Sequence, residues 1–182
     1  MPKAEIVIGV GGGVAGYKSA MLVSQLVQHD ISVHVVLSRT ARQFIGGATF
    51  AALTGRQPMV DLFDHRFPLG AHIELARSAD LFCVAPATAN FLAKAANGLS
   101  DDLLSTLYLC CTCPVLVCPA MNVEMWQKAA VQRNVEQLQH DGVQTVGPES
   151  GWLSCRTTGM GRMSEPATIF EAILEQLKKR SR

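Results

Sequence analysis

Four stretches of the chain are apolar at nearly every position, without alternating polar residues. Continuous runs of this kind are typical of strands that are buried on both faces of a parallel sheet. They predict strands at residues 6–10, 33–37, 81–85 and 115–118. A weaker run at residues 143–146 predicts an edge strand.

Between these strands, apolar residues recur at helical spacing. Four such stripes predict helices around residues 22–27, 92–96, 131–138 and 169–177. Strand and helix therefore alternate, which is typical of an α/β fold with a three-layer, doubly wound parallel sheet of the Rossmann-like type. Residues 148–161 are predicted to be the longest irregular segment, and their glycines suit a mobile flap over a site.

The length of 182 residues, with 48% hydrophobic and 17% charged residues, suits a single domain over residues 1–182. A formal net charge of +1 provides no broad basic surface for nucleic acid. No apolar run approaches the ~20 residues that cross a bilayer, and residues 1–9 already read as a strand rather than a signal peptide. We therefore expect a cytoplasmic protein that binds neither nucleic acid nor membranes.

The cysteines fall into two groups. Cys155 lies in a polar, glycine-flanked segment, whereas the others lie in apolar runs where a small hydrophobic residue would serve. Their spacing is not a paired C-x-x-C pattern, so we expect no metal site. The apolar group comprises Cys83, Cys110, Cys111, Cys113 and Cys118.

A glycine-rich loop follows the first predicted strand. Gly11, Gly13 and Gly16 fit the pattern G-x-G-x-x-G, whose glycines let the backbone approach a phosphate at the positive end of the next helix. Glycines that only allow tight helix–sheet contact are the alternative.

The residues after the second predicted strand bear on which nucleotide this loop would hold. A dinucleotide site usually has an Asp or Glu there, but residues 38–40 are Ser-Arg-Thr. Arg39 could meet the 2′-phosphate of NADP, although two hydroxyls flanking an arginine equally suit the terminal phosphate of FMN. We favour a mononucleotide.

Polar residues also follow the third and fourth predicted strands. Thr88 and Asn90 lie among small residues that leave room for a flat ring, and Asn122 follows the next strand. Ligands bind outside the carboxyl ends of parallel strands, so these residues are site candidates. Capping of the following helices is an alternative for Thr88 and Asn122. We interpret Asp101 and Asp102 as helix-dipole partners rather than catalysts.

Further motifs follow the glycine loop in a fixed order. They are HIEL at residues 72–75, PATAN at 86–90, GLSDDLLST at 98–106, PAMNVEMW at 119–126 and GMGRM at 159–163. Together they resemble the flavin-containing cysteine decarboxylases over nearly the whole chain. The resemblance implies FMN as cofactor and a carboxy-lyase reaction, the conversion of 4′-phosphopantothenoylcysteine to 4′-phosphopantetheine in coenzyme A biosynthesis.

The same resemblance assigns roles to individual residues. It implies that His72 is the active-site histidine, that Cys155 is the proton donor on a flap, and that Asn122 and Met163 bind the substrate. It also implies a homotrimer or a multiple of trimers, such as a homododecamer, with the site at a subunit interface, and a separate phosphopantothenoylcysteine synthetase. FMN is expected to contact Gly12, Gly13, Val14, Ser38, Thr40, Thr88, Ala89, Asn90 and Ala120.

The expected reaction explains why such residues are needed. Decarboxylation of a cysteine carboxylate requires an electron sink, which a flavin provides by oxidising the thiol-bearing carbon to a thioaldehyde. The resulting enethiolate then needs hydride and a proton, and Cys155 is the candidate acid. His72 would act as a base or a positive partner, and Asn122 would donate to a carboxylate or amide of the substrate.

Three residues depart from the family pattern. The family commonly has glycine and then an acid after the flap cysteine, where this chain has Arg156 and Thr157. Phe91 stands where a threonine often follows the PATAN asparagine. We therefore expect the conformation of the flap and one flavin contact to differ from the family pattern.

Other functions compete with this hypothesis. A peptidyl-cysteine decarboxylase would stop at the enethiol, and Cys155 with the GMGRM motif argues against it. A flavin prenyltransferase would need a different polar set at residues 86–90. An FMN-binding regulatory protein without turnover is a third alternative, which the presence of His72, Asn122 and Cys155 together disfavours. An NADP-binding module is a fourth.

Overall fold

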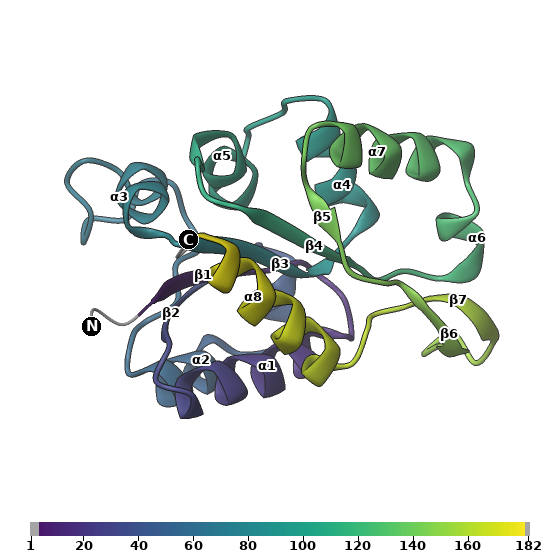
Figure 1. The fold of residues 1–182 in the computed structure, drawn as a ribbon, viewed down its shortest axis with the longest axis horizontal. Coiled ribbons are helices and arrows are strands. Elements are labelled where there is room, and N and C mark those ends of the chain that lie inside the picture. The colour runs from purple at the N-terminus through teal and green to yellow at the C-terminus, as the bar shows by residue number, and fades with distance from the viewer. Residues whose placement is uncertain (1–3, 181–182) are drawn as a thin grey trace.

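The computed structural model describes residues 4–180, and within them a five-stranded parallel sheet forms the centre of the molecule (Figure 1). The strand order is β2-β1-β3-β4-β5, so the sheet grows in one direction from β1 to β2 and in the other from β3 onward. All five predicted strands are confirmed. They are β1 (Glu5–Val10), β2 (Ser32–Leu37), β3 (Leu81–Ala87), β4 (Val115–Pro119) and β5 (Gln144–Thr145).

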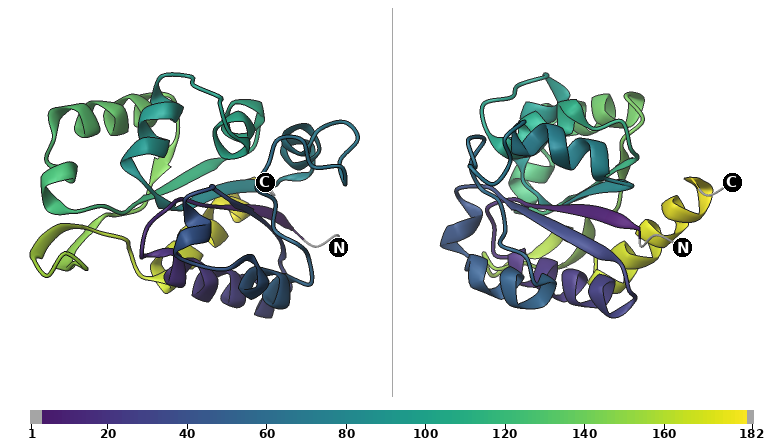
Figure 2. Two further views of the ribbon diagram at one scale, coloured as in Figure 1. Left: turned by 180° about the vertical axis from the view of Figure 1, so that it is seen from behind. Right: turned by 90° about the vertical axis from the view of Figure 1, so that its left-hand side faces the viewer.

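Helices cover both faces of this sheet, which confirms the doubly wound α/β fold (Figure 2). One face carries α1 (Gly16–Gln28), α2 (Gly47–Thr54) and α8 (Pro166–Arg180). The other carries α3 (Ala71–Ser78), α4 (Ala89–Ala96), α5 (Leu103–Cys110) and α7 (Ala129–His140). Two short elements complete the set, the 3-10 helix η1 (Ala41–Gln43) and α6 (Val123–Trp126).

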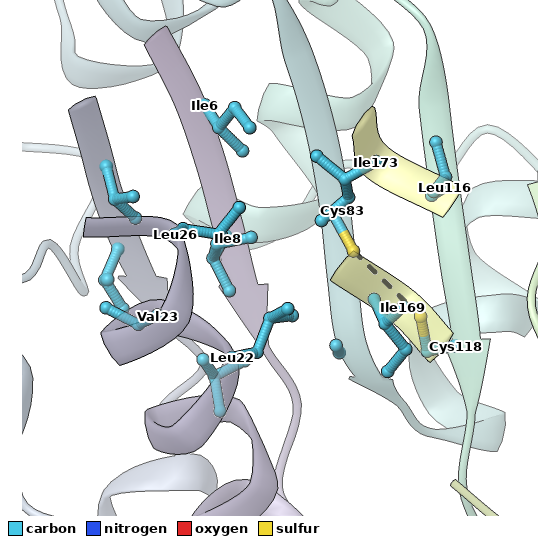
Figure 3. Close-up of a cluster of buried hydrophobic side chains, with 14 of the residues drawn as sticks. Ile6, Ile8, Leu22, Val23, Leu26, Cys83, Leu116, Cys118, Ile169 and Ile173 are labelled. Atoms are coloured by element: carbon cyan, nitrogen blue, oxygen red, sulfur yellow. Dashed lines mark hydrogen bonds between the residues drawn. The ribbon is translucent and has the colours of Figure 1, made fainter. Parts of the chain in front are cut away.

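The continuous apolar runs of the strands follow from this two-sided burial. Successive side chains of a strand point to opposite faces, so Ile6 and Ile8 pack toward α1 and α8 while Val7 packs on the other side. Figure 3 shows the first of these clusters, in which the thiols of Cys83 and Cys118 lie 4.0 Å apart. Both thiols are buried and act as small apolar groups, as predicted.

The prediction of an irregular segment at residues 148–161 is wrong. The chain instead forms an antiparallel hairpin of β6 (Glu149–Trp152) and β7 (Thr158–Arg162). Glycine lowers strand propensity, and Gly151 and Gly159 stand opposite each other in this hairpin. The sequence of residues 148–161 is therefore rich in glycine, as loops are, although the segment forms two strands.

None of the helices within residues 4–180 is both long and apolar enough to span a membrane.

Candidate active site

A cavity of about 570 Å³ opens beyond the carboxyl ends of β1, β3 and β4. A second cavity of about 320 Å³ adjoins it, and the two share Gly12, Phe44, Thr88, Ala89 and Met125. They lie where the strand order reverses between β1 and β3. In this strand order that switch point is the usual position of a bound nucleotide.

The glycine loop forms one wall of the larger cavity. A Cβ on Gly11 would collide with the carbonyl oxygen of Pro86, and one on Gly12 would collide with Thr40, so these glycines are needed for close backbone packing. A Cβ on Gly13 would meet nothing within 4 Å among the described residues. The loop thus both packs tightly and leaves open space toward the cavity.

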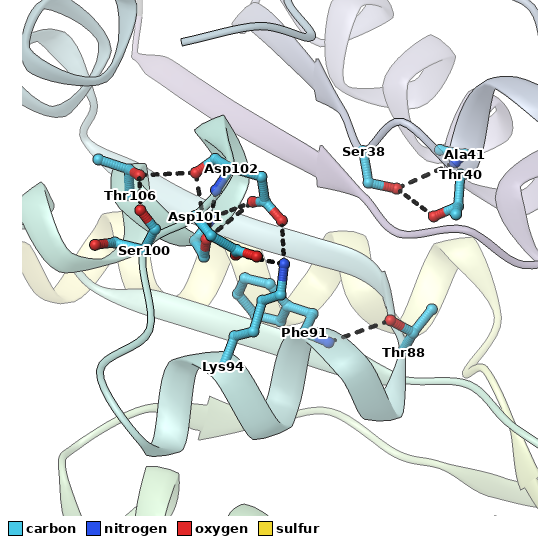
Figure 4. A network of polar contacts seen from close by, with 11 residues as sticks. Ser38, Thr40, Ala41, Thr88, Phe91, Lys94, Ser100, Asp101, Asp102 and Thr106 are labelled. Atoms are coloured by element: carbon cyan, nitrogen blue, oxygen red, sulfur yellow. Dashed lines mark hydrogen bonds and ion pairs between the residues drawn. The ribbon is translucent and has the colours of Figure 1, made fainter.

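The smaller cavity offers donors for an anion. None of the described side chains caps the first turn of α1, where the backbone N–H groups of Gly16 and Lys18 instead donate to the carbonyls of Gly13 and Ala15, both at 3.0 Å. The hydroxyls of Ser38 and Thr40 lie 3.2 Å apart and line the smaller cavity (Figure 4). Arg39 instead has a side chain that is 83% exposed and pairs with Asp61 at 3.2 Å. Arg39 lines neither cavity, which disfavours a site for the 2′-phosphate of NADP.

Thr88 and Asn122 are helix caps that also line the larger cavity. The Thr88 hydroxyl accepts a hydrogen bond from the backbone N–H of Phe91 at 3.3 Å, and the Asn122 side-chain oxygen accepts one from Met125 at 2.9 Å. Both capping predictions are confirmed. Since the cap uses the oxygen of Asn122, its amide N–H groups are the ones that can reach a ligand.

Phe91, which departs from the family pattern, is part of the packed interior. Its ring is buried and contacts Tyr108 edge-on, with the ring centroids 6.2 Å apart. The residue also lines the smaller cavity. An aromatic ring therefore lies at the smaller cavity where the family pattern has a smaller polar residue.

The paired acids Asp101 and Asp102 lie around a lysine at the edge of the smaller cavity (Figure 4). Asp102 caps α5 by accepting from the backbone N–H of Ser105 at 2.8 Å, and Lys94 donates to both carboxylates, at 2.5 and 2.6 Å. Burial alone would raise the pKa of Asp102, but the hydrogen bonds from Lys94 and Ser105 outweigh it and lower that pKa. The prediction that these acids stabilise a helix start is confirmed for Asp102, whereas Asp101 only pairs with Lys94.

The β6–β7 hairpin rests on the turn that follows β4. The backbone N–H of Met121 donates to the carbonyl of Gly161 at 2.9 Å. A Cβ on Gly161 would collide with Met121, and one on Gly159 would collide with Val123. These glycines therefore let β7 lie directly against the segment that carries Asn122.

Cys155 lies in the loop at the tip of this hairpin and lines the larger cavity. Its thiol is exposed and lies 3.1 Å from the hydroxyl of Thr157. The backbone N–H of Leu153 donates to the carbonyl of Thr157, and that of Arg156 donates to the carbonyl of Leu153, both at 2.8 Å. These bonds are typical of a three-residue hairpin loop that ends in a left-handed residue, and Arg156 has a φ of +67°.

The Flavoprotein family model matches residues 1–178 of the chain. The chain belongs to this family. Among curated relatives, it is 42% identical over 168 residues to the coenzyme A biosynthesis bifunctional protein CoaBC of Bacillus subtilis, covering 92% of this chain and 41% of that protein. It is 40% identical over 179 residues to CoaBC of Mycobacterium tuberculosis strain H37Rv, covering 97% and 42%. The chain thus spans about two fifths of the length of these relatives.

Solved structures of similar proteins match nearly the whole of this chain. The FMN-dependent cysteine decarboxylase SpaF matches with a TM-score of 0.85 and 33% identity over 98% of each chain. A mutant PPC decarboxylase complexed with pantothenoylaminoethenethiol matches with a TM-score of 0.86 and 26% identity, covering 97% of this chain and 99% of that one. The predicted Rossmann-like flavoprotein fold is confirmed.

The cavities bring together most of the site residues that we predicted for this flavoprotein. Met163 is only 1% exposed, and it lines the cavity from within the core. The remaining lining residues among those predicted are Gly12, Gly13, Val14, Ser38, Thr40, Thr88, Ala89, Asn90, Ala120, Asn122 and Cys155.

His72 is the exception. It lies in the first turn of α3, outside the residues that line the two cavities. Figures 1 and 2 show α3 and the β6–β7 hairpin at opposite ends of the molecule. The Nδ1 atom of His72 is buried and has no hydrogen-bond partner within residues 4–180. A single flavoprotein chain therefore does not bring His72 to Cys155.

The sequence analysis also missed residues that line the cavity. Lys18 had a detectable signal, since it stands four residues before Leu22 on the buried stripe of α1, where a lysine is unexpected. Other lining side chains, which had no such signal, are Tyr17, Phe44, Met125 and Trp152.

Proposed function

We propose that this flavoprotein decarboxylates 4′-phosphopantothenoylcysteine to 4′-phosphopantetheine with FMN as cofactor, and that residues 1–182 act as one catalytic domain. The observation that carries the proposal is the cavity at the strand-order switch point, which has Asn122 on its wall and Cys155 on the hairpin above it. The names of the relatives support it, since they include proteins of coenzyme A biosynthesis and a PPC decarboxylase.

The residues around the two cavities fit FMN. Together, volumes of about 570 and 320 Å³ fall within the usual range for a cofactor site. Ser38, Thr40 and the glycine loop before α1 would hold the phosphate, because hydroxyl groups and backbone N–H groups line the cavities there, at the positive end of a helix. Thr88, Ala89, Asn90 and Ala120 would border the ring. When bound, FMN supplies two-electron oxidation and reduction at the thiol-bearing carbon of the substrate.

The chain's own side chains would orient the substrate and move protons. Asn122 donates from its amide to the substrate carboxylate or amide, and Met163, which lines the same cavity, contacts the substrate. Oxidation of the thiol-bearing carbon gives a thioaldehyde, and loss of carbon dioxide then leaves an enethiolate. Cys155 gives its thiol proton to the carbon that lost the carboxylate as that substrate is reduced, and it regains a proton from solvent.

We further propose that a neighbouring copy supplies His72, in a trimer or a multiple of trimers. Contacts between copies would cover the surface beside the cavity and the surface near α3, and apolar side chains are exposed on both surfaces. Val14 in the glycine loop and Tyr17 and Met21 on α1 are exposed, and the first two line the cavity. Phe63 and Leu69 are exposed in the segment before α3. Burial of these surfaces against another copy would join the cavity of one chain to α3 of the next.

Subunit mixing tests this arrangement. His72→Asn and Cys155→Ser protein would be assayed separately and after subunit exchange, with the saturated thiol measured by mass. If the two residues come from different copies, some mixed interfaces hold both wild-type residues and form the saturated product. If one chain supplies both, every site stays defective and mixing restores nothing, which would refute the shared site.

The reaction itself is tested with the wild-type protein. We expect purified protein to bind FMN and to convert 4′-phosphopantothenoylcysteine to the saturated thiol with loss of carbon dioxide. Protein that binds FMN without releasing carbon dioxide would favour the regulatory alternative. Accumulation of an enethiol would favour a peptidyl-cysteine decarboxylase. Protein that does not bind FMN would refute the proposal.

A further inference from the structure

Lys18 is a buried lysine that the proposed reaction does not use. It lies on α1, is 6% exposed and lines the larger cavity. Its ammonium donates to the carbonyl of Met163 at 2.8 Å and to the carboxylate of Glu165 at 2.9 Å. Burying an ammonium group is costly unless it is paired, so these two bonds fix where the chain after β7 meets α1.

Further ion pairs connect Glu165 to the β6–β7 hairpin. Arg162 lies 3.3 Å from the carboxylate of Glu165 and 3.5 Å from that of Glu149. The Arg162 side chain also runs across Gly151, where an added Cβ would come within 2.9 Å of its Nε atom. Glu149 and Gly151 belong to β6 and Arg162 to β7. A row of alternating charges therefore links α1 to both strands of the hairpin.

A two-stranded hairpin is marginally stable by itself. The β6–β7 pair forms its own sheet, separate from the central one, in the described part of the chain. Its base is held by the Met121–Gly161 hydrogen bond on one side and by the Lys18 contacts on the other. The orientation of the tip therefore depends on both attachments.

We infer that Lys18 is a positioning residue, which holds the hairpin so that the Cys155 thiol stays over the cavity. This inference rests on the proposed function, because it concerns the proton that Cys155 delivers. Oxidation and loss of carbon dioxide do not require Cys155, so a loosened hairpin leaves them in place. Protonation of the enethiolate then competes poorly with its release.

The test compares Lys18→Met with Lys179→Met at equal bound FMN. Methionine preserves much of the volume of Lys18 but removes both bonds, whereas Lys179 is an exposed residue near the end of α8. We expect the ratio of enethiol to saturated thiol to rise about tenfold in Lys18→Met, the effect of losing a charge-assisted hydrogen bond, and to stay at the wild-type value in Lys179→Met. A wild-type product ratio in Lys18→Met would overturn the inference, even if total turnover fell.

Two further measurements distinguish loss of the positioning role from a folding defect and from failure of the proposed function. Glu165→Gln keeps Lys18 bonded to Met163 and should change the product ratio in the same direction by a smaller factor. Amide exchange, which needs no substrate, should be faster across residues 149–162 in Lys18→Met and unchanged in α7. Wild-type protein that fails to decarboxylate would refute the proposed function alone. Unchanged exchange in the hairpin would refute the positioning role alone.

Discussion

The backbone of Arg156 allows a direct test of the unusual hairpin loop. Arg156 has a φ of +67°, in the left-handed region that favours glycine, and it closes the loop that carries Cys155. A residue with a side chain is disfavoured there by ~1–2 kcal/mol. Arg156→Gly removes this strain, but glycine also costs ~0.5–1 kcal/mol in backbone entropy. We therefore expect the hairpin to become more stable by about 0.5–1 kcal/mol.

Amide exchange of the hairpin is the appropriate assay, because the hairpin can open without global unfolding. The backbone N–H groups of Leu153 and Arg156 are hydrogen-bonded within the loop and report its opening. A gain of 0.5–1 kcal/mol corresponds to exchange that is about two to five times slower at Leu153.

Arg156→Ala is the matched control for this experiment. It removes the same guanidinium group but keeps a Cβ in the left-handed conformation, so it should show no slowing. Equal exchange rates in the glycine and alanine variants would refute the conclusion that left-handed strain at this position weakens the hairpin. In that case the charge of Arg156, rather than its backbone, would account for any change.

Three other predictions concern catalysis, capping and pH. Cys155→Ser should still release carbon dioxide but yield an enethiol by mass, and a saturated product would contradict its role as the acid. Asp102→Ala should lower the free energy of unfolding by ~1–2 kcal/mol in urea titrations, because α5 loses its cap and Lys94 a partner. Asp101→Ala, whose side chain is 70% exposed, should cost less than ~0.5 kcal/mol, and equal losses would contradict the capping role. Burial lowers the pKa of His34 below its ordinary 6.5, so its stabilising effect is present above that pH and is lost as the pH falls. The free energy of unfolding should therefore decline below pH 6.5 less steeply in His34→Gln than in the wild type, and equal slopes would contradict this.

The sheet was predictable because its strands are buried on both faces. Residues such as Ile6, Val7 and Ile8 are fully buried, and this leaves an apolar run that no surface element produces. The helices α2 and α3 were not predicted. Residues 47–54 of α2 are small or apolar at most positions and so show no separate polar face, and α3 buries only Ala71, Leu75 and Ala76, which is too few for a clear helical stripe.

The candidate site was predictable where a residue type and a strand end coincided, as at Thr88 and Asn122. The hairpin was missed because its glycines serve docking rather than flexibility, and Gly161 fits only because Met121 lies against it. A lysine on the buried stripe of α1 is visible in the sequence, but the partners of Lys18 are not, because Met163 and Glu165 are about 145 residues away. Their proximity depends on the complete fold.

The most direct test of FMN-dependent decarboxylation combines two signals in one sample. FMN-saturated protein would be mixed with 4′-phosphopantothenoylcysteine without oxygen, while the flavin absorbance and the product mass are followed together. We predict that the absorbance of oxidised flavin falls and then returns as the saturated thiol appears. Release of carbon dioxide with the absorbance unchanged throughout would contradict the proposed chemistry, and so would the absence of any product from protein that has bound FMN.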